Sequence, residues 1–149
     1  MIPDAFIQLA EHLSKESPAA AACYRTATSR AYYGAYLTVR ALIRDEFGIS
    51  CRIDSQSSDH QSLAQLLANS QVTQTVQIGY RLSNLHDSRK LADYDMNYVD
   101  VEDAQASADA VQRAKYILSL LDQCRLEPTR SQLIAGSIQY RKLLGLSPR

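Results

Sequence analysis

The stretch Arg81–Asp95, RLSNLHDSRKLADYD, carries three cations, a histidine, three carboxylates and a tyrosine within a few helical turns. Apolar residues recur at helical spacing through it, so we expect the end of an amphipathic helix with its polar residues on the rim. Arg89 and Asp93 lie four residues apart, the spacing of an ordinary helical salt bridge. The stretch predicts a helix end rich in charge and a candidate site for handling phosphate.

The same periodicity extends outward in both directions, and no segment alternates with the period of a strand. We therefore predict an all-α fold, an antiparallel bundle of four to five helices with a short extra C-terminal helix. Residues 1–124 would form the bundle, and residues 125–149 a helical extension of the same domain. The expected helices are about Pro3–Glu16, about Ala19–Phe47, a short one from Ser58, about Thr73–Leu91, Val101 to about Gln123, and a short sixth one ending at Gly145.

Helix-start signals set several of these boundaries. Ser58 with Gln61, and Thr129 with Gln132, have the spacing of capping boxes. Asp100 is the expected cap of the helix that begins at Val101. Gly48 is the expected C-terminal stop of the helix that ends at about Phe47.

Length and charge limit the classes of function. The chain has 149 residues, the size of about one domain, and its 16 basic and 16 acidic residues give a formal net charge of zero. The overall charge therefore offers no sign of nucleic-acid binding, which would have to come from local patches. Arginines are concentrated between Arg25 and Arg52, and carboxylates between Asp93 and Asp109.

Cysteine usage and the N-terminus indicate a cellular compartment. The three cysteines are odd in number and widely spaced, as expected of reduced thiols. The N-terminal segment is amphipathic and acidic, unlike a signal peptide, and no apolar run reaches membrane-spanning length. We expect a soluble, cytoplasmic protein with no membrane association.

The histidines do not predict a metal site. His12, His60 and His86 fall on different expected helices, without a second ligand three or four residues away. We therefore expect neither a metal nor another cofactor. The chain also lacks a glycine-rich phosphate loop and a Gly-x-Ser-x-Gly elbow, which argues against common nucleotide hydrolases and serine hydrolases.

Three segments together carry a family resemblance. They are S29-R-A-Y-Y-G-A-Y36, R81-L-S-N-L-H86 and R89-K-L-A-D-Y-D95. In this order the chain resembles the HEPN superfamily, especially its small stand-alone members, over roughly residues 5 to 123. The resemblance implies a HEPN-like helical bundle that forms a homodimer.

The resemblance also implies an activity. Arg81 and His86, with four residues between them, match the motif of HEPN-type metal-independent endoribonucleases, in which two copies form one composite cleft. Arg81 would stabilise the phosphate, His86 would act as general acid or base, and Asn84 would orient one of them. For this chain the resemblance implies a toxin or defence-type effector that acts on RNA, as in toxin–antitoxin systems, and that is held in check by a nucleotidyltransferase or another regulatory protein.

A second hypothesis is a non-catalytic HEPN module that binds a nucleotide or a protein. Its binding residues would be Arg30, Arg89, Asp93 and Tyr94, with Arg30 facing the end of the helix that carries the other three. The neutral net charge and Leu82, directly after Arg81 where the family pattern has a polar residue, favour this reading. At about 100° per residue, Arg81 and His86 also lie roughly 140° apart around a regular helix.

Overall fold

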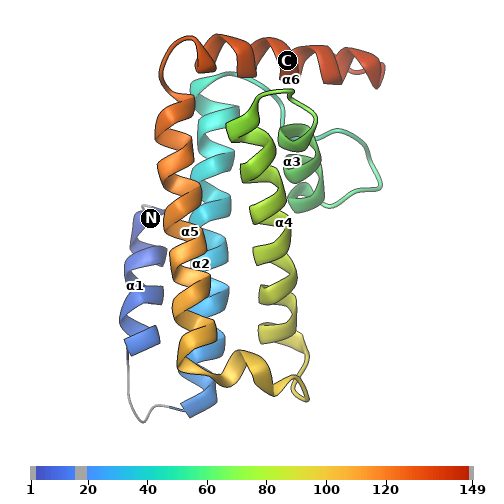
Figure 1. Cartoon of the computed structure of the whole chain (residues 1–149). Helices are drawn as coiled ribbons and strands as arrows, with labels where there is room; N and C mark the ends of the chain where they lie inside the picture. Colours follow the sequence, from blue (N-terminus) through green and yellow to red (C-terminus); the bar gives the residue numbers. More distant parts are fainter. Residues whose placement is uncertain (1–2, 16–19, 148–149) are drawn as a thin grey trace. The chain divides into compact units, whose positions relative to one another are not determined.

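The computed structural model describes residues 3–15 and 20–147, and within these ranges it contains helices and no strand. The prediction of an all-α bundle is confirmed. The helices, labelled in Figure 1, are α1 (Asp4–Lys15), α2 (Ala20–Ala41), α3 (Asp59–Ala68), α4 (Thr73–Tyr94), α5 (Ala104–Cys124) and α6 (Thr129–Leu143). A π-helical segment, Leu42–Glu46, continues α2, and a 3-10 turn, Val99–Glu102, precedes α5.

The chain divides into two compact units. The first contains residues 1–38 and 84–116, and the second contains residues 39–83 and 117–149. Helices α2, α4 and α5 each contribute residues to both units, whereas α3 and α6 belong to the second alone.

The first unit is held together by small residues on α2. Ala27, Ala31 and Ala35 are fully buried there. A Cβ atom at Gly34 would come within 2.5 Å of Ile7 Cγ1, so the glycine lets α1 pack closely against α2. On the surface, Lys115 of α5 donates to Glu11 of α1 over 2.7 Å. This unit positions the C-terminal half of α4.

The second unit contains the π-helical segment and α6. The N–H of Phe47 donates to the carbonyl of Leu42, five residues back, as in a π-helix. Gly48 then ends the helix at φ 65°, as its position in the sequence predicts. A Cβ atom at Gly136 of α6 would overlap the carbonyl oxygen of Ser70, so α6 touches backbone in the turn between α3 and α4.

Helix starts are predicted with mixed success. The Ser58–Gln61 capping box at the start of α3 is present. Asp100 is not the cap of α5, because residues 99–102 form a separate 3-10 turn, and Asp103 accepts the Ala106 N–H at 3.0 Å instead.

Other boundaries differ from the predicted ones in detail. The Thr129–Gln132 capping box is absent: Pro128 is the N-cap of α6, and the N–H of Gln132 donates to its carbonyl. Helix α2 changes to π geometry after Ala41, and α4 continues to Tyr94. The predicted end of the first helix, Glu16, and the predicted start of the second, Ala19, lie outside the described residues.

Two further expectations concern the cysteine thiols and membrane-spanning helices. Cys23, Cys51 and Cys124 all have free thiols. Within the described ranges, none of the helices combines the length and apolar character needed to cross a membrane.

Candidate functional site

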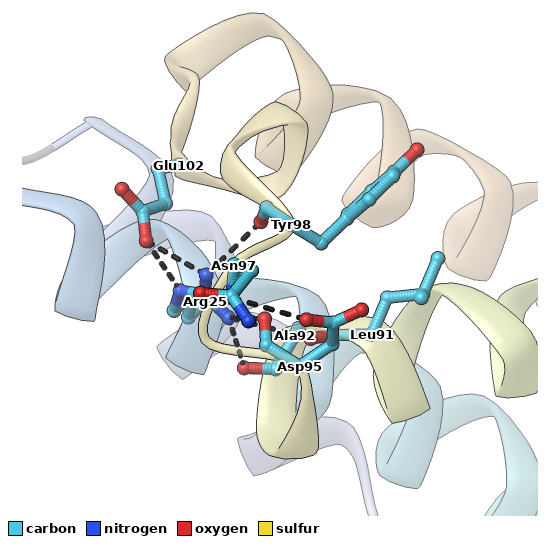
Figure 2. A network of polar contacts seen from close by, with 7 residues as sticks. All are labelled: Arg25, Leu91, Ala92, Asp95, Asn97, Tyr98 and Glu102. Atoms are coloured by element: carbon cyan, nitrogen blue, oxygen red, sulfur yellow. Dashed lines mark hydrogen bonds and ion pairs between the residues drawn. The ribbon is translucent and has the colours of Figure 1, made fainter.

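The C-terminal end of α4 is fixed by Arg25, a residue to which the sequence assigns no role. Its side chain projects from α2 and is only 7% exposed. Its guanidinium donates over 3.0–3.3 Å to four backbone carbonyls, those of Leu91, Ala92, Asp95 and Tyr98. Figure 2 shows this network. The last carbonyls of a helix have no partner within the helix, so Arg25 supplies donors that the helix lacks.

Glu102 completes this network. Arg25 Nε donates to Glu102 Oε1 over 2.8 Å, and Nη2 lies 2.7 Å from the same oxygen. The carboxylate neutralises a cation that would be costly to bury alone. Arg25 therefore holds together the end of α4, the following turn and the 3-10 segment, and it fixes where residues 93–99 lie.

A second arginine, Arg89, contacts two of the other expected binding residues, Asp93 and Tyr94. Its Nη2 donates to the hydroxyls of Tyr33, over 2.7 Å, and Tyr94, over 3.1 Å. Its Nε lies 2.8 Å from Asp93 Oδ2 but is not directed at it as a hydrogen bond requires. Ser29 Oγ donates to the same carboxylate oxygen over 3.1 Å. We call these five residues the Arg89 cluster.

The positive charge of Arg89 is stabilised by the other side chains of the Arg89 cluster. The guanidinium carbon lies 5.2 Å from the Tyr33 ring centroid and 5.0 Å from that of Tyr94, within cation–π range. Burial opposes the charge, but Tyr33, Asp93 and Tyr94 together raise the pKa of Arg89 above its usual value. Tyr94 is nevertheless 70% exposed, so one aromatic side chain of the cluster remains open to a ligand.

His86 lies against a buried tyrosine. Its ring centroid is 5.2 Å from that of Tyr32, at an interplanar angle of 45°. Tyr32 also stacks on Tyr36 at 5.8 Å. Burial raises the pKa of Tyr32, and the two neighbouring tyrosines add to the effect, so its phenol stays neutral. His86 is half-buried, and the stacked tyrosines give its imidazole a rigid support.

The other two residues of the expected catalytic set, Asn84 and Arg81, belong to different units. Asn84 belongs to the first unit, like His86, and its side chain is exposed. Arg81 is half-buried and belongs to the second unit. All three lie on α4, the helix expected to carry them.

Arg30 does not join the Arg89 cluster. Its guanidinium carbon lies 5.6 Å from the centroid of the Phe6 ring on α1. The expectation that Arg30 faces the Asp93 and Tyr94 end of α4 is therefore wrong, and its neighbour Ser29 makes the contact with Asp93. Neighbouring residues on a helix point about 100° apart, so the motif identified the correct turn and the wrong side chain.

In the described part of the chain, no group of three or more His, Cys, Asp or Glu side chains is placed to hold a metal ion. Comparisons of the chain with protein-family models, with curated proteins and with solved structures found no match.

Proposed function

We propose that this protein is a HEPN-type, metal-independent endoribonuclease that acts as a homodimer in a toxin or defence role and is controlled by a regulatory partner. The observation that supports it best is the position of His86. The ring lies 5.2 Å from Tyr32 and is half-buried, so it has a rigid support while keeping contact with solvent. The spacing of Arg81 and His86, which resembles the HEPN endoribonuclease motif, also supports the proposal.

The chemistry needs few groups. An RNA 2′-hydroxyl attacks the adjacent phosphorus, and the leaving 5′-oxygen takes up a proton. A histidine exchanges protons near neutral pH, which suits His86 as general acid or base. The guanidinium of Arg81 stabilises the added negative charge on the phosphate through charge-assisted hydrogen bonds. The exposed amide of Asn84 orients the substrate or one of these two groups.

An apolar turn supports the proposed homodimer. Tyr94, Met96 and Val99 are 70%, 68% and 63% exposed, and they lie between the last residue of α4 and the first residue of the 3-10 turn. Neighbouring large apolar side chains on a surface are typical of interaction sites. A second copy of the chain would cover this turn.

The activity test uses purified protein and single-stranded RNA in EDTA. Wild type should produce fragments ending in 2′,3′-cyclic phosphates, and His86→Ala and His86→Gln should abolish cleavage. The matched control is His12→Ala, which removes an exposed histidine on α1 and should leave the rate unchanged. Cleavage that survives in both His86 variants would rule out this mechanism.

The dimer has its own test. Light scattering after size exclusion should give a dimer for wild type and a monomer for Met96→Asp. Leu126→Asp places the same charge on a side chain of similar exposure, 65%, outside the apolar turn, and should leave the dimer intact. A wild-type monomer at micromolar concentration would remove the homodimer from the proposal.

One observation favours the second candidate, a non-catalytic binding module. A hollow of about 660 Å³ lies along the end of α4, lined by Asp87, Lys90, Leu91, Tyr94 and Asp95. The exposed Tyr94 ring offers a stacking face for a nucleotide base. If no RNA is cleaved while AMP binds, and Tyr94→Ala weakens that binding but Tyr116→Ala does not, the binding module is the correct function.

A further inference from the structure

A separate pocket in the second unit gathers three arginines. Its volume is about 300 Å³, and it is lined by Arg40, Arg44, Ser50, Cys51, Arg52 and Asp59. Arg40 comes from the last turn of α2, and Arg44 from the π-helical segment that follows. Residues 50–52 belong to the next loop, and Asp59 is the first residue of α3. We call this the arginine pocket.

The arginine pocket has more positive charge than its own side chains neutralise. Arg44 pairs with Asp45 through two contacts of 2.6 and 3.0 Å, and Arg52 uses Nε to donate to the carbonyl of Asp54. Within residues 3–15 and 20–147, the guanidinium of Arg40 makes no hydrogen bond or ion pair. Arg40 and Arg44 are four residues apart, a spacing at which like charges repel, and Asp45, whose pKa is lowered chiefly by Arg44 and also by Arg40, offsets part of this repulsion. An anion bound between them would relieve that repulsion.

Arg141 of α6 anchors the loop that completes the pocket through hydrogen bonds to its backbone. This side chain is 4% exposed, and its Nη1 donates to the carbonyls of Ser50 and Arg52 over 2.9 and 2.6 Å. Its Nε donates to the carbonyl of Ser147 over 2.8 Å. The two loop carbonyls are therefore occupied and less able to repel an anion. A loop fixed before binding also loses less conformational entropy when a ligand arrives.

We propose that the arginine pocket binds the phosphomonoester group of a phosphorylated sugar. Guanidinium groups recognise phosphate through paired, charge-assisted hydrogen bonds. Small-molecule pockets range from about 300 to 1,000 Å³, so the volume admits a small ligand. Asp59 would repel a bare anion, whereas a carboxylate accepts hydrogen bonds from hydroxyl groups, as does Ser50. A sugar phosphate satisfies both kinds of lining.

The phosphorylated sugar has two sources, a free metabolite or the 5′ end of an RNA. Both present a phosphomonoester on ribose, so the arginine pocket recognises the same group in each. The site is independent of the proposed ribonuclease, because none of its lining residues belongs to the Arg81, Asn84 and His86 set.

The test is titration calorimetry with ribose 5-phosphate at low salt. We expect saturable binding to wild type, weakened at least about tenfold in Arg40→Met and in Arg52→Met. Arg113→Met removes a half-buried arginine of the first unit and serves as the matched control, with unchanged affinity. Circular dichroism melts should show that all three variants are folded.

The same titration distinguishes a free sugar phosphate from an RNA end, and it can also refute the proposal. The site is assigned to RNA ends if short RNA with a 5′ phosphate binds at least about tenfold more tightly than ribose 5-phosphate. That RNA must also bind more tightly than the same RNA with a 5′ hydroxyl. Equal or weaker RNA binding assigns it to the free sugar phosphate. Unchanged affinity in Arg40→Met, or sulfate binding as tightly as ribose 5-phosphate, would refute the proposal.

Cys51 provides a second measurement inside the arginine pocket. Its thiol is half-buried among the lining residues, so a bound ligand should cover it. Ribose 5-phosphate should slow alkylation of Cys51 by neutral iodoacetamide, as followed by peptide mass spectrometry, and leave Cys23 unaffected. Equal alkylation of Cys51 with and without saturating ligand would place the bound ligand elsewhere.

Discussion

Arg25 and Arg40 lie on the same helix, α2, and differ in what surrounds their guanidinium groups. Arg25 is 7% exposed and donates to four carbonyls and one carboxylate of its own chain. Arg40 is half-buried, lines a hollow of about 300 Å³, and makes none of these contacts in the described ranges. The first arginine supports the fold, whereas the second keeps its donors available to a ligand.

The difference shows that arginine content alone does not reveal function. The concentration of arginines between Arg25 and Arg52 contains both kinds, and only their contacts separate them. If the comparison is correct, replacing arginines by methionine should lower stability in proportion to the internal hydrogen bonds that each one makes.

Arg25→Met should cause the largest loss, about 3 kcal/mol in the free energy of unfolding, because several carbonyls and Glu102 lose a charged partner together. Urea denaturation followed by circular dichroism measures it. Arg113→Met, in the same unit, should cost far less. A loss below about 1 kcal/mol for Arg25→Met would mean that water replaces the guanidinium, and the comparison would fail.

Arg141→Met should come second, at about 2 kcal/mol, since three carbonyls lose their donor. The control on the same helix is Arg130→Met, which removes an exposed side chain. Arg141→Met should also weaken ribose 5-phosphate binding, although Arg141 does not line the arginine pocket. Normal binding in a destabilised variant would show that the loop keeps its shape without this anchor.

Asp93→Asn tests an intermediate case, the Arg89 cluster. The Arg89–Asp93 pair is partly shielded, with side chains 12% and 26% exposed, so we expect a loss of about 1 kcal/mol at neutral pH. The Asp87–Lys90 pair on the same helix is 62% and 51% exposed, and Asp87→Asn should change stability little. Equal effects of the two substitutions would mean that shielding adds nothing to the pair.

Arg40→Met should change stability by no more than about 0.5 kcal/mol in either direction, the range of ordinary surface substitutions. The loss of Arg40–Arg44 repulsion favours the upper, stabilising side of that range. Thermal melts in buffer without phosphate measure the effect. A loss comparable to that of Arg141→Met would make Arg40 a structural residue and remove the contrast with Arg25.

The smallest signal is the reactivity of Cys51. Burial raises the pKa of this thiol to about 11, so the thiolate fraction at pH 8 is about one in a thousand. Its alkylation should accelerate about tenfold per pH unit between pH 8 and 10, whereas in urea the rate should level off near the usual cysteine pKa of about 8.5. A folded-state rate that levels off below pH 9 would show that the pocket exposes Cys51 fully.

Local signals in the sequence predicted much of this fold. The Ser58–Gln61 box, the stop at Gly48 and the Arg89–Asp93 pair each depend on residues within four positions or on one backbone angle. Their physics is contained in the local sequence, so the spacing alone was sufficient.

Contacts between distant segments could not be predicted in this way. Arg25 reaches acceptors 66 to 77 residues away, and most of them are carbonyls, which every residue possesses. Its one sequence signal, an arginine within a helix of small buried residues, is ambiguous. The Asp100 prediction failed because Asp103 offers the same chemistry three residues later, and only the 3-10 turn decides between the two.

The π-helical segment after α2 carries one residue more in each hydrogen-bonded ring than an α-helix does. A relative of this chain lacking one residue between positions 42 and 46 would revert to regular helix there, and everything after it would rotate by about 100°. Arg40 would keep its place, while the loop with Cys51 and Arg52 would turn away from it. The geometry of the arginine pocket therefore depends on the π-helical hydrogen bonding of this segment, and a comparison of helix lengths among related chains would test this.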